Sequence, residues 1–172
     1  MYEEQTAENA ATLAKEAYAS EKICGNNIKL HSDNGSPMKG STMLLTLQKL
    51  GVVPSFSRPS VSNDNPFSES LFRTLKYCPE YPSKPFESIV QANQWVTSFV
   101  KWYNTKHLHS GLKFLTPESR HKGTEGKIIE NRIKVYEMAK SKNPIRWAGK
   151  TRNWMPDAKV LLNPDILDAK AA

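Results

Sequence analysis

The amino-acid sequence predicts an α/β protein that is mostly helical, with two short parallel strands and a basic C-terminal tail. Short apolar runs of strand length stand at residues 27–32 and 52–56, and turn-forming residues follow the first of them. Apolar residues recur at helical spacing in several other stretches, one of which lies between the two runs. Because a helix connects the two strands, we expect them to pair in parallel.

The first predicted elements are a helix, a strand and a second helix. The first helix runs from Thr6, whose side-chain oxygen can cap it, to about Ser20, and it is rich in alanine. The strand at residues 27–32 ends before the turn at Gly35. The second helix is predicted between Ser41 as its cap and Gly51 as its stop. Its apolar positions repeat at helical spacing: Met43, Leu44, Leu47 and Leu50.

The second predicted strand, residues 52–56, contains Pro54. Proline has no N–H to donate to a neighbouring strand, so we expect an edge strand. A polar loop at residues 58–64 follows, and then a helix from Pro66 to about Tyr77, which Asn65 can cap and Pro66 can start. The residues expected to pack inward from this helix are Leu71, Phe72 and Leu75.

Two further helices are predicted in the C-terminal half. A Pro-rich connector at residues 78–85 leads into a long helix from Phe86 to about Lys106, and a last helix spans Gly126 to about Lys140. The long helix carries one apolar stripe, which we interpret as core: Ile89, Ala92, Trp95, Val96, Phe99, Trp102 and Tyr103. We expect a main domain over residues 1–120 and a basic extension over residues 121–172.

Positive charge is concentrated in one part of the chain. The net charge of the 172 residues is +7, and residues 113–152 hold 11 Lys and Arg against 4 Asp and Glu, the same excess. This distribution favours a polyanionic partner. No apolar run approaches the roughly 18 residues that span a bilayer, so we expect no membrane partner. The two cysteines, Cys24 and Cys78, follow no metal-ligand spacing and indicate a reducing cytosol.

Two acids mark a candidate metal site. Asp33 follows the first predicted strand, and Glu69 lies in the first turn of the helix that starts at Pro66, with 35 residues between the two acids. This interval can hold a helix, a strand and a loop, so the fold can bring both carboxylates to one end of the sheet. Carboxylates suit Mg²⁺, which is commonly held by one or two of them together with substrate phosphates. The alternative is a chance pair, because the chain has 17 acids.

The residues around these acids resemble the second half of the catalytic core of insertion-sequence transposases, which are relatives of retroviral integrases. The order and spacing of the segments match over roughly residues 3–165. The matching segments are His31-Ser32-Asp33-Asn34-Gly35-Ser36, Ser57-Arg58-Pro59, Asp64-Asn65, Glu69-Ser70-Leu71-Phe72-Arg73-Thr74-Leu75-Lys76, Trp102-Tyr103-Asn104, His107-Leu108-His109-Ser110-Gly111, Thr116-Pro117 and Leu161-Leu162-Asn163-Pro164.

The resemblance implies an RNase H-like fold with three metal-binding acids and Mg²⁺ or Mn²⁺ as cofactor. Asp33 matches the second acid and Glu69 the third. The first acid of the family stands at the end of a strand some 60 or more residues earlier, whereas 32 residues precede Asp33 here, with their acids in a helical stretch. We therefore expect a truncated integrase core, a fragment that lacks the first Asp and the first strands of the sheet.

Arg73 and Lys76 are candidate DNA contacts on the same helix as Glu69. The three residues are spaced i, i+4 and i+7, so they share one stripe. The resemblance implies that the two cations bind the phosphates beside the metal site. The alternative is an ordinary salt-bridge ladder on the helix surface.

Other candidate DNA contacts lie in the loops and in the basic tail. Arg58 belongs to the motif that follows the second strand. His107 and His109 are read as loop structure or as phosphate contacts, and their spacing alone is weak as a metal site. Lys150 and Arg152 stand between tryptophans, in a pattern that suits stacking on nucleic acid. Equally, Trp147 and Trp154 can pin the tail onto its own domain.

The function implied by the resemblance is DNA transposition and integration, through metal-dependent strand cleavage and strand transfer. The expected partners are the DNA of the element ends and of the target, with a homo-oligomer assembled on DNA. We expect a bacterial cytoplasmic protein that is associated with the nucleoid when bound to DNA. The alternative is a catalytically inactive DNA-binding remnant, because a site that needs three carboxylates has two.

Overall fold

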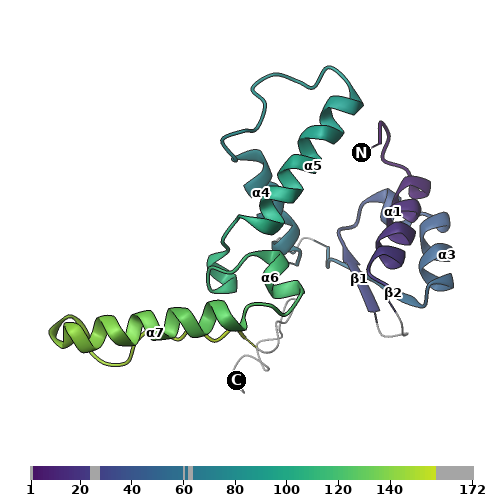
Figure 1. Ribbon diagram of the computed structural model, residues 1–172. Helices are drawn as coiled ribbons and strands as arrows, with labels where there is room; N and C mark the ends of the chain where they lie inside the picture. Colours follow the sequence, from purple (N-terminus) through teal and green to yellow (C-terminus); the bar gives the residue numbers. More distant parts are fainter. Residues whose placement is uncertain (1, 24–27, 60, 62–63, 158–172) are drawn as a thin grey trace. The chain divides into compact units, whose positions relative to one another are not determined.

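The computed structural model describes residues 2–23, 28–59, 61 and 64–157. Cys24, residue 27 of the first predicted strand and the motif at 161–164 lie outside these ranges. Figure 1 shows the order of the elements. Their bounds are α1 Ala7–Ser20, β1 Ile28–Ser32, α2 Ser36–Lys39, α3 Ser41–Lys49, β2 Val52–Phe56, α4 Pro66–Lys76, α5 Ile89–Thr105, η1 Ser110–Leu112, α6 Pro117–His121, α7 Gly126–Lys142 and η2 Pro144–Arg146.

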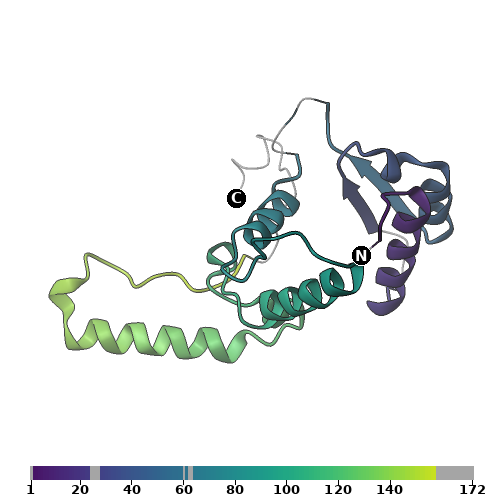
Figure 2. The ribbon, with the colours of Figure 1, turned by 90° about the horizontal axis from the view of Figure 1, so that it is seen from above.

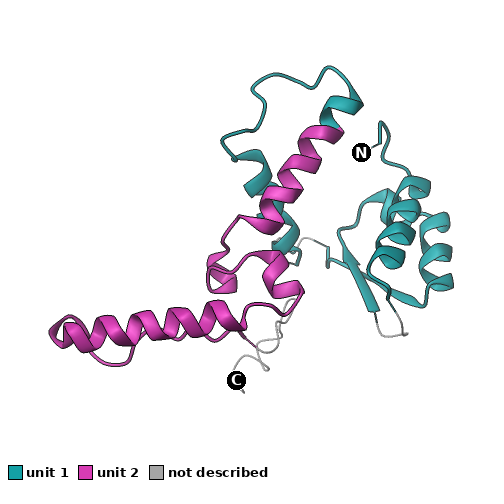
Figure 3. Cartoon of the chain, in the orientation of Figure 1, with its two compact units in different colours: residues 1–92, 161–172 teal, residues 93–160 magenta. Residues whose placement is uncertain are grey.

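The chain forms two compact units, coloured separately in Figure 3. Among the described residues, unit 1 ends at Ala92, in the first turn of α5, and unit 2 begins at Asn93. No helix in the described part of the chain is both long and apolar enough to cross a membrane.

Strands β1 and β2 form the sheet of unit 1 and pair in parallel, as predicted. Ile28 lies opposite Val52, and Leu30 lies opposite Pro54. Because successive side chains of a strand point to opposite faces, Ile28, Leu30 and Val52 share the face that packs into the core. His31 and its partner Ser55 lie on the other face, which is where the polar contacts described below begin.

Helices α1 and α3 cover one face of this sheet (Figures 1 and 2). The buried residues of this core are Ala11, Met43, Leu47 and Val52. The small alanine side chains of α1 let α1 come close to α3, and the apolar face of α3 predicted from Met43 and Leu47 is buried. This packing holds β1 and β2 in place, so the positions of their carboxyl ends are set by the core.

Of the three predicted end residues of α1 and α3, two are confirmed and one is wrong. The Thr6 side chain accepts a hydrogen bond from the Asn9 N–H at 3.2 Å, as expected of an N-cap. Gly51 has φ 68° and ends α3, as predicted. The prediction for Ser41 is wrong: Ser41 is the first residue of α3, and Gly40 occupies the cap. The reason is that the short helix α2 fills residues 36–39, so that Gly40 alone separates α2 from α3.

Helix α4 begins at Pro66 as predicted, but two expectations about it are wrong. Asn65 makes no capping hydrogen bond with its side chain. Leu71 and Phe72 do not pack inward: Leu71 is exposed, 57% of the surface of Phe72 is exposed, and no residue of α4 is buried. The physical reason is that the apolar core of unit 1 is already formed by α1, α2, α3 and the two strands.

Helix α5 begins three residues later than predicted because two side chains cap its first turn. The Ser88 hydroxyl accepts a hydrogen bond from the Gln91 N–H at 3.2 Å, and the Gln91 side chain accepts one from the Glu87 N–H at 2.7 Å. These two bonds place the start of the helix at Ile89. Phe99 is buried and stacks on Trp95, with ring centroids 5.6 Å apart, which confirms the core interpretation at Phe99.

Unit 2 has a second apolar cluster between the loop after α5 and helix α7. Leu115, Ile129 and Trp154 are buried in it. Lys113 and Phe114 both have positive φ, and Arg132 on α7 donates hydrogen bonds to their carbonyl oxygens at 2.7 Å each. Arg132 therefore holds a strained turn against α7.

Candidate metal and DNA site

Asp33 follows β1 directly and lies in a tight turn. The Gly35 N–H donates a hydrogen bond to Asp33 Oδ1 at 3.0 Å. A Cβ at position 35 would lie 3.0 Å from the same oxygen, so a larger residue there would crowd the carboxylate. The Asp33 side chain is exposed at the rim of the sheet. The turn therefore orients one carboxylate oxygen and leaves the group open to a ligand.

The loops that follow the two strands are tied to each other. The Asn34 side chain donates a hydrogen bond to the Ser57 carbonyl at 2.7 Å, and the Ser57 N–H donates one to the Ser32 carbonyl at 2.9 Å. These contacts continue the β1–β2 pairing beyond its last residue pair, Ser32 and Phe56. They place Asp33 beside the start of the loop that leads to α4.

Asp33 and Glu69 line the same cavity. Glu69 comes from the first turn of α4, and the volume of the cavity is about 480 Å³. Seven of its nine lining residues have polar side chains: Asp33, Asn34, Ser57, Arg58, Asn65, Ser68 and Glu69, with Val61 and Phe72 completing the lining. The two acids have 35 residues between them in the sequence, and the fold of unit 1 brings them to one hollow.

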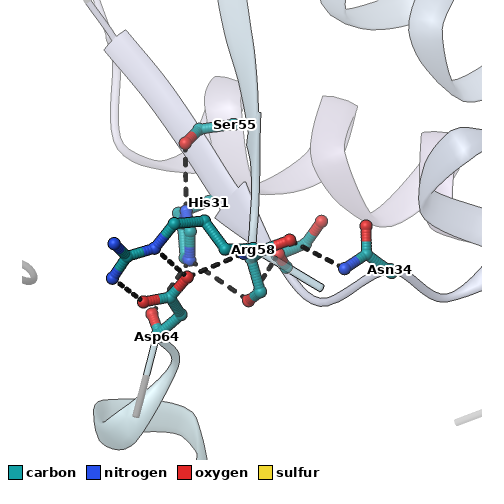
Figure 4. A network of polar contacts seen from close by, with 7 residues as sticks. His31, Asn34, Ser55, Arg58 and Asp64 are labelled. Atoms are coloured by element: carbon teal, nitrogen blue, oxygen red, sulfur yellow. Dashed lines mark hydrogen bonds and ion pairs between the residues drawn. The ribbon is translucent and has the colours of Figure 1, made fainter. Parts of the chain in front are cut away.

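An ion pair closes the loop between β2 and α4, and Figure 4 shows it from close by. The Arg58 Nε donates to Asp64 Oδ2 at 3.0 Å, and Nη2 donates to Oδ1 at 2.8 Å. The Arg58 backbone N–H also donates to Asp64 Oδ2, at 2.7 Å. Asp64 is 3% exposed, whereas the Arg58 side chain is 68% exposed. A buried carboxylate held by a forked guanidinium is a strong, well-oriented contact.

His31 connects this loop to the sheet. Its Nε2 lies 3.0 Å from the Asp64 carbonyl oxygen, and its Nδ1 lies 3.0 Å from the Ser55 hydroxyl (Figure 4). Hydrogen bonds from the Arg58 side chain and backbone lower the pKa of the Asp64 carboxyl from its usual 3.8 to about 2, and the charges of Arg58 and His31 act in the same direction. Asp64 is therefore ionised throughout the physiological range.

The predicted DNA contacts on α4 are exposed cations. Arg73 and Lys76 lie in the last turn of the helix whose first turn carries Glu69. Within the described residues, neither forms an ion pair, so the alternative of a salt-bridge ladder on this stripe finds no support. Arg58 lines the cavity with Asp33 and Glu69, but its guanidinium is already paired with Asp64.

His107 and His109 belong to an aromatic cluster in unit 2. Their rings meet edge to face with centroids 4.6 Å apart, and the Tyr103 ring lies within 5.4 Å of both. Burial, and then the charge of His107, lower the pKa of His109. These contacts support the interpretation as loop structure. No group of three His, Cys, Asp or Glu side chains placed to hold a metal is found among the residues that the structure describes.

The tail after α7 is held by its tryptophans. Trp154 is 6% exposed and lies edge-on to Tyr136, with ring centroids 5.1 Å apart. The Arg152 guanidinium lies over the rings of Phe114 and Trp154, at 4.9 and 4.8 Å. Of the two interpretations of this segment, the pinned tail is the one these contacts support. Lys150 is exposed, and DNA contact by Lys150 and Arg152 stays a prediction.

Asp64 and His31 belong to the sequence motifs given above, but the motifs predict no role for either residue. Asp64 directly precedes Asn65-Pro66, where a helix is predicted to start. This position is a signal that Asp64 anchors the start of that helix. His31 lies opposite Ser55 in the paired strands. This pairing can be derived from the sequence once the two predicted strands are aligned. The pairing of Asp64 with Arg58 has no local signal, because it depends on the path of the loop.

Part of the chain matches a known protein family. Residues 50–117 match the family model described as integrase core domain. This range includes Arg58, Glu69, Arg73 and Lys76, and Asp33 lies before it.

Two curated proteins are similar to the chain. The transposase for insertion sequence element IS904 of Lactococcus lactis subsp. lactis (strain IL1403) is 34% identical over 94 residues, which cover 54% of this chain and 37% of that protein. The putative transposase InsK for insertion sequence element IS150 of Escherichia coli (strain K12) is 33% identical over 88 residues, which cover 51% of this chain and 31% of that protein. The matched part thus spans about a third of each relative's length.

Proposed function

We propose that the chain acts in DNA transposition by metal-dependent strand cleavage and strand transfer. The basis is its similarity to insertion-sequence transposases and to the integrase core domain. The observation that carries the proposal is the shared cavity: Asp33 and Glu69, the acids that match the second and third metal ligands, line one hollow. Two exposed cations, Arg73 and Lys76, lie in the last turn of the helix that carries Glu69. An RNase H-like core with Mg²⁺ or Mn²⁺ as its cofactor is part of this proposal.

The donor set fits a hard divalent cation. Asp33 and Glu69 offer carboxylate oxygens at an exposed site, and Mg²⁺ is commonly bound by one or two carboxylates and completed by waters and substrate phosphates. When bound, such an ion polarises the phosphate and activates the attacking oxygen. The Gly35 N–H fixes Asp33 Oδ1, while Oδ2 accepts no hydrogen bond from any described residue and is open to coordination.

The remaining residues of the site position DNA. Arg73 and Lys76 follow Glu69 on α4. A DNA strand that places a phosphate at the two acids would therefore run along α4, and these two cations would bind its neighbouring phosphates. Salt-dependent attraction of this kind is independent of base sequence. The element ends and the target DNA are therefore the proposed partners, with a homo-oligomer on DNA and nucleoid association as their consequence.

A second candidate function is DNA binding without strand cleavage. It is favoured by the observation that the described residues bring no third His, Cys, Asp or Glu side chain to the two acids. Under this proposal the chain binds DNA through the same cations and carries out no chemistry by itself. The two candidates differ in one measurable property, which is cleavage.

The test uses Mn²⁺ as a spectroscopic probe of the metal site. We expect the full chain to bind Mn²⁺ in an electron paramagnetic resonance titration, and Asp33→Asn and Glu69→Gln to weaken that binding by at least tenfold. Glu130→Gln, which removes an exposed acid from α7, is the matched control and should bind like the wild type. Equal Mn²⁺ affinity in all four proteins would contradict the proposed site.

Cleavage of a labelled DNA duplex then separates the two candidates. Metal-dependent nicking that is lost in both acid variants supports the transposase chemistry. Binding of the duplex without nicking supports the second candidate. Binding and nicking are scored on the same protein samples, so a failure to bind DNA contradicts both.

A further inference from the structure

Asp64 is buried beside two residues that line the candidate metal site, Arg58 and Asn65, and its carboxylate is taken up by Arg58. Both carboxylate oxygens accept hydrogen bonds from Arg58, one on Oδ1 and two on Oδ2. The carboxylate charge is compensated at close range, since Arg58 Nη2 lies 2.8 Å from Oδ1. An acid in this state holds a structure in place rather than a metal.

The main chain of Asp64 is held from a second direction. Its carbonyl oxygen can only accept a hydrogen bond, so His31 Nε2 must carry the proton of that 3.0 Å contact. The other ring nitrogen, Nδ1, then meets the Ser55 hydroxyl on β2. The side chain of Asp64 is thus held by Arg58, which lies in the loop after β2. The backbone of Asp64 is held by His31 of β1.

Both proposed metal ligands lie close to this contact along the chain. Asp33 is two residues after His31, and Glu69 is five residues after Asp64. Helix α4 begins two residues after Asp64, and the Glu69 N–H donates to the Asn65 carbonyl at 3.3 Å within its first turn. A shift of Asp64 against His31 therefore moves the start of α4 and carries Glu69 with it.

We propose that Asp64 is a positioning residue, which acts through Arg58 and His31 to set the place of Glu69 relative to Asp33. The inference rests on the proposed function of the same site and deepens it by a residue whose contacts to Arg58 and His31 connect the two loops of that site. The contacts that carry it lie outside the apolar core of unit 1, which is formed by α1, α2, α3 and the strands. Loss of the Asp64 contacts should loosen the site while the core stays folded.

The experiment compares Asp64→Asn with a control of the same charge change. Glu118→Gln breaks the Glu118–Lys122 ion pair on α6 in unit 2, and it removes one negative charge as Asp64→Asn does. We expect Asp64→Asn to weaken Mn²⁺ binding by about tenfold or more, as is usual for partners that orient metal ligands. Glu118→Gln should bind Mn²⁺ like the wild type. Circular dichroism confirms that both variants keep their helices.

A double variant tests the route through Arg58. If Asp64 acts through Arg58, Arg58→Met alone weakens Mn²⁺ binding, and Asp64→Asn adds little to it. Additive losses would overturn that route. A wild-type affinity in Asp64→Asn, with Asp33→Asn and Glu69→Gln still weakened, would overturn the inference and leave the metal site standing.

Amide hydrogen exchange provides a reading that needs no metal. Asp64→Asn should speed the exchange of the Glu69 N–H, because the first turn of α4 is no longer anchored, whereas Glu118→Gln should not. If the wild type binds no Mn²⁺, the proposed function fails, and this exchange rate alone decides whether Asp64 positions Glu69. Unchanged exchange in Asp64→Asn would overturn the inference in either case.

Discussion

Gly40 and Ala7 approach so closely that a Cβ at position 40 would lie 2.5 Å from the Ala7 Cβ. Gly40 has φ −62° and ψ 144°, which any residue can adopt, so crowding rather than backbone strain requires glycine there. Ala7 is the first residue of α1, and Gly40 directly precedes α3. This contact sets how closely the two helices that cover the sheet can pack.

Gly40→Ala is therefore expected to lower the free energy of unfolding of unit 1 by about 1–3 kcal/mol, the usual cost of overpacking. The measurement is urea denaturation, with unit 1 followed by the NMR signals of β1 and β2. Gly111→Ala is the control, because a Cβ there meets no atom within 4 Å, and its effect should stay within about 0.5 kcal/mol. Equal effects of the two variants would show that α1 moves aside without cost.

Trp154 is expected to be the largest single contributor to the folding of the tail in unit 2. Its buried ring contacts Tyr136, Phe114 and the guanidinium groups of Arg132 and Arg152. Trp154→Ala should lower the free energy of unfolding of unit 2 by about 3–5 kcal/mol, as for other buried aromatic truncations. Chemical denaturation followed by the NMR signals of α7 measures it.

Ile145→Ala is the matched control for that variant. Ile145 is fully exposed in the same tail, so its removal should leave the unfolding of unit 2 unchanged within about 0.5 kcal/mol. A small effect of Trp154→Ala would contradict the pinned tail and return the segment to the nucleic-acid interpretation.

Arg73 and Lys76 are expected to contribute one phosphate contact each. For duplex DNA, the slope of log K against log salt concentration should become shallower by about 0.9 when either residue is changed to alanine. Fluorescence anisotropy with a labelled duplex, recorded over a range of salt concentrations, measures the slope. Lys15→Ala, which removes an exposed cation from α1, should leave it unchanged. Identical slopes for all variants would remove α4 from the DNA interface.

Acid is expected to release the loop between β2 and α4. The folded protein holds the pKa of Asp64 at about 2, below its usual 3.8, because Arg58 stabilises the carboxylate. The stabilisation is fully present above pH 3.8 and is lost as the pH falls from there to about 2. Asp64→Asn should lack this step. Unfolding midpoints of both proteins between neutral pH and about pH 2 test it, and parallel curves would contradict the pairing.

Much of the fold followed from local pattern. Strand β2 has the predicted bounds, and β1 and α3 agree closely with theirs. The reason is that short apolar runs, helical spacing and the Gly51 stop each lie within a short segment. The errors had local causes as well. The predicted start of α5 is wrong because the Ser88 and Gln91 side chains cap the helix at Ile89, and the predicted cap of α3 is wrong because α2 precedes it.

At the candidate site, too, local sequence predicts some features and not others. Asp33 and Glu69 are candidates named from the residues around them. The resemblance of the segment around Glu69 to an integrase-type core agrees with the family match over residues 50–117, and Asp33 lies before that range. The exposure of Leu71 and Phe72 could not be predicted, because an amphipathic pattern shows which face of a helix is apolar but not whether a core lies against that face.

By itself, the sequence determined both strands and most of the longer helices, which acids are candidates for a metal, and where positive charge gathers, since each depends on neighbours a few residues away. Only the tertiary structure decided that Asp33 and Glu69 share one cavity, that Arg58 is paired with Asp64, and that Trp154 is buried against Tyr136. The physical reason is that these relations join residues far apart along the chain. They are set by how the strands, loops and helices pack, and no short segment contains that information.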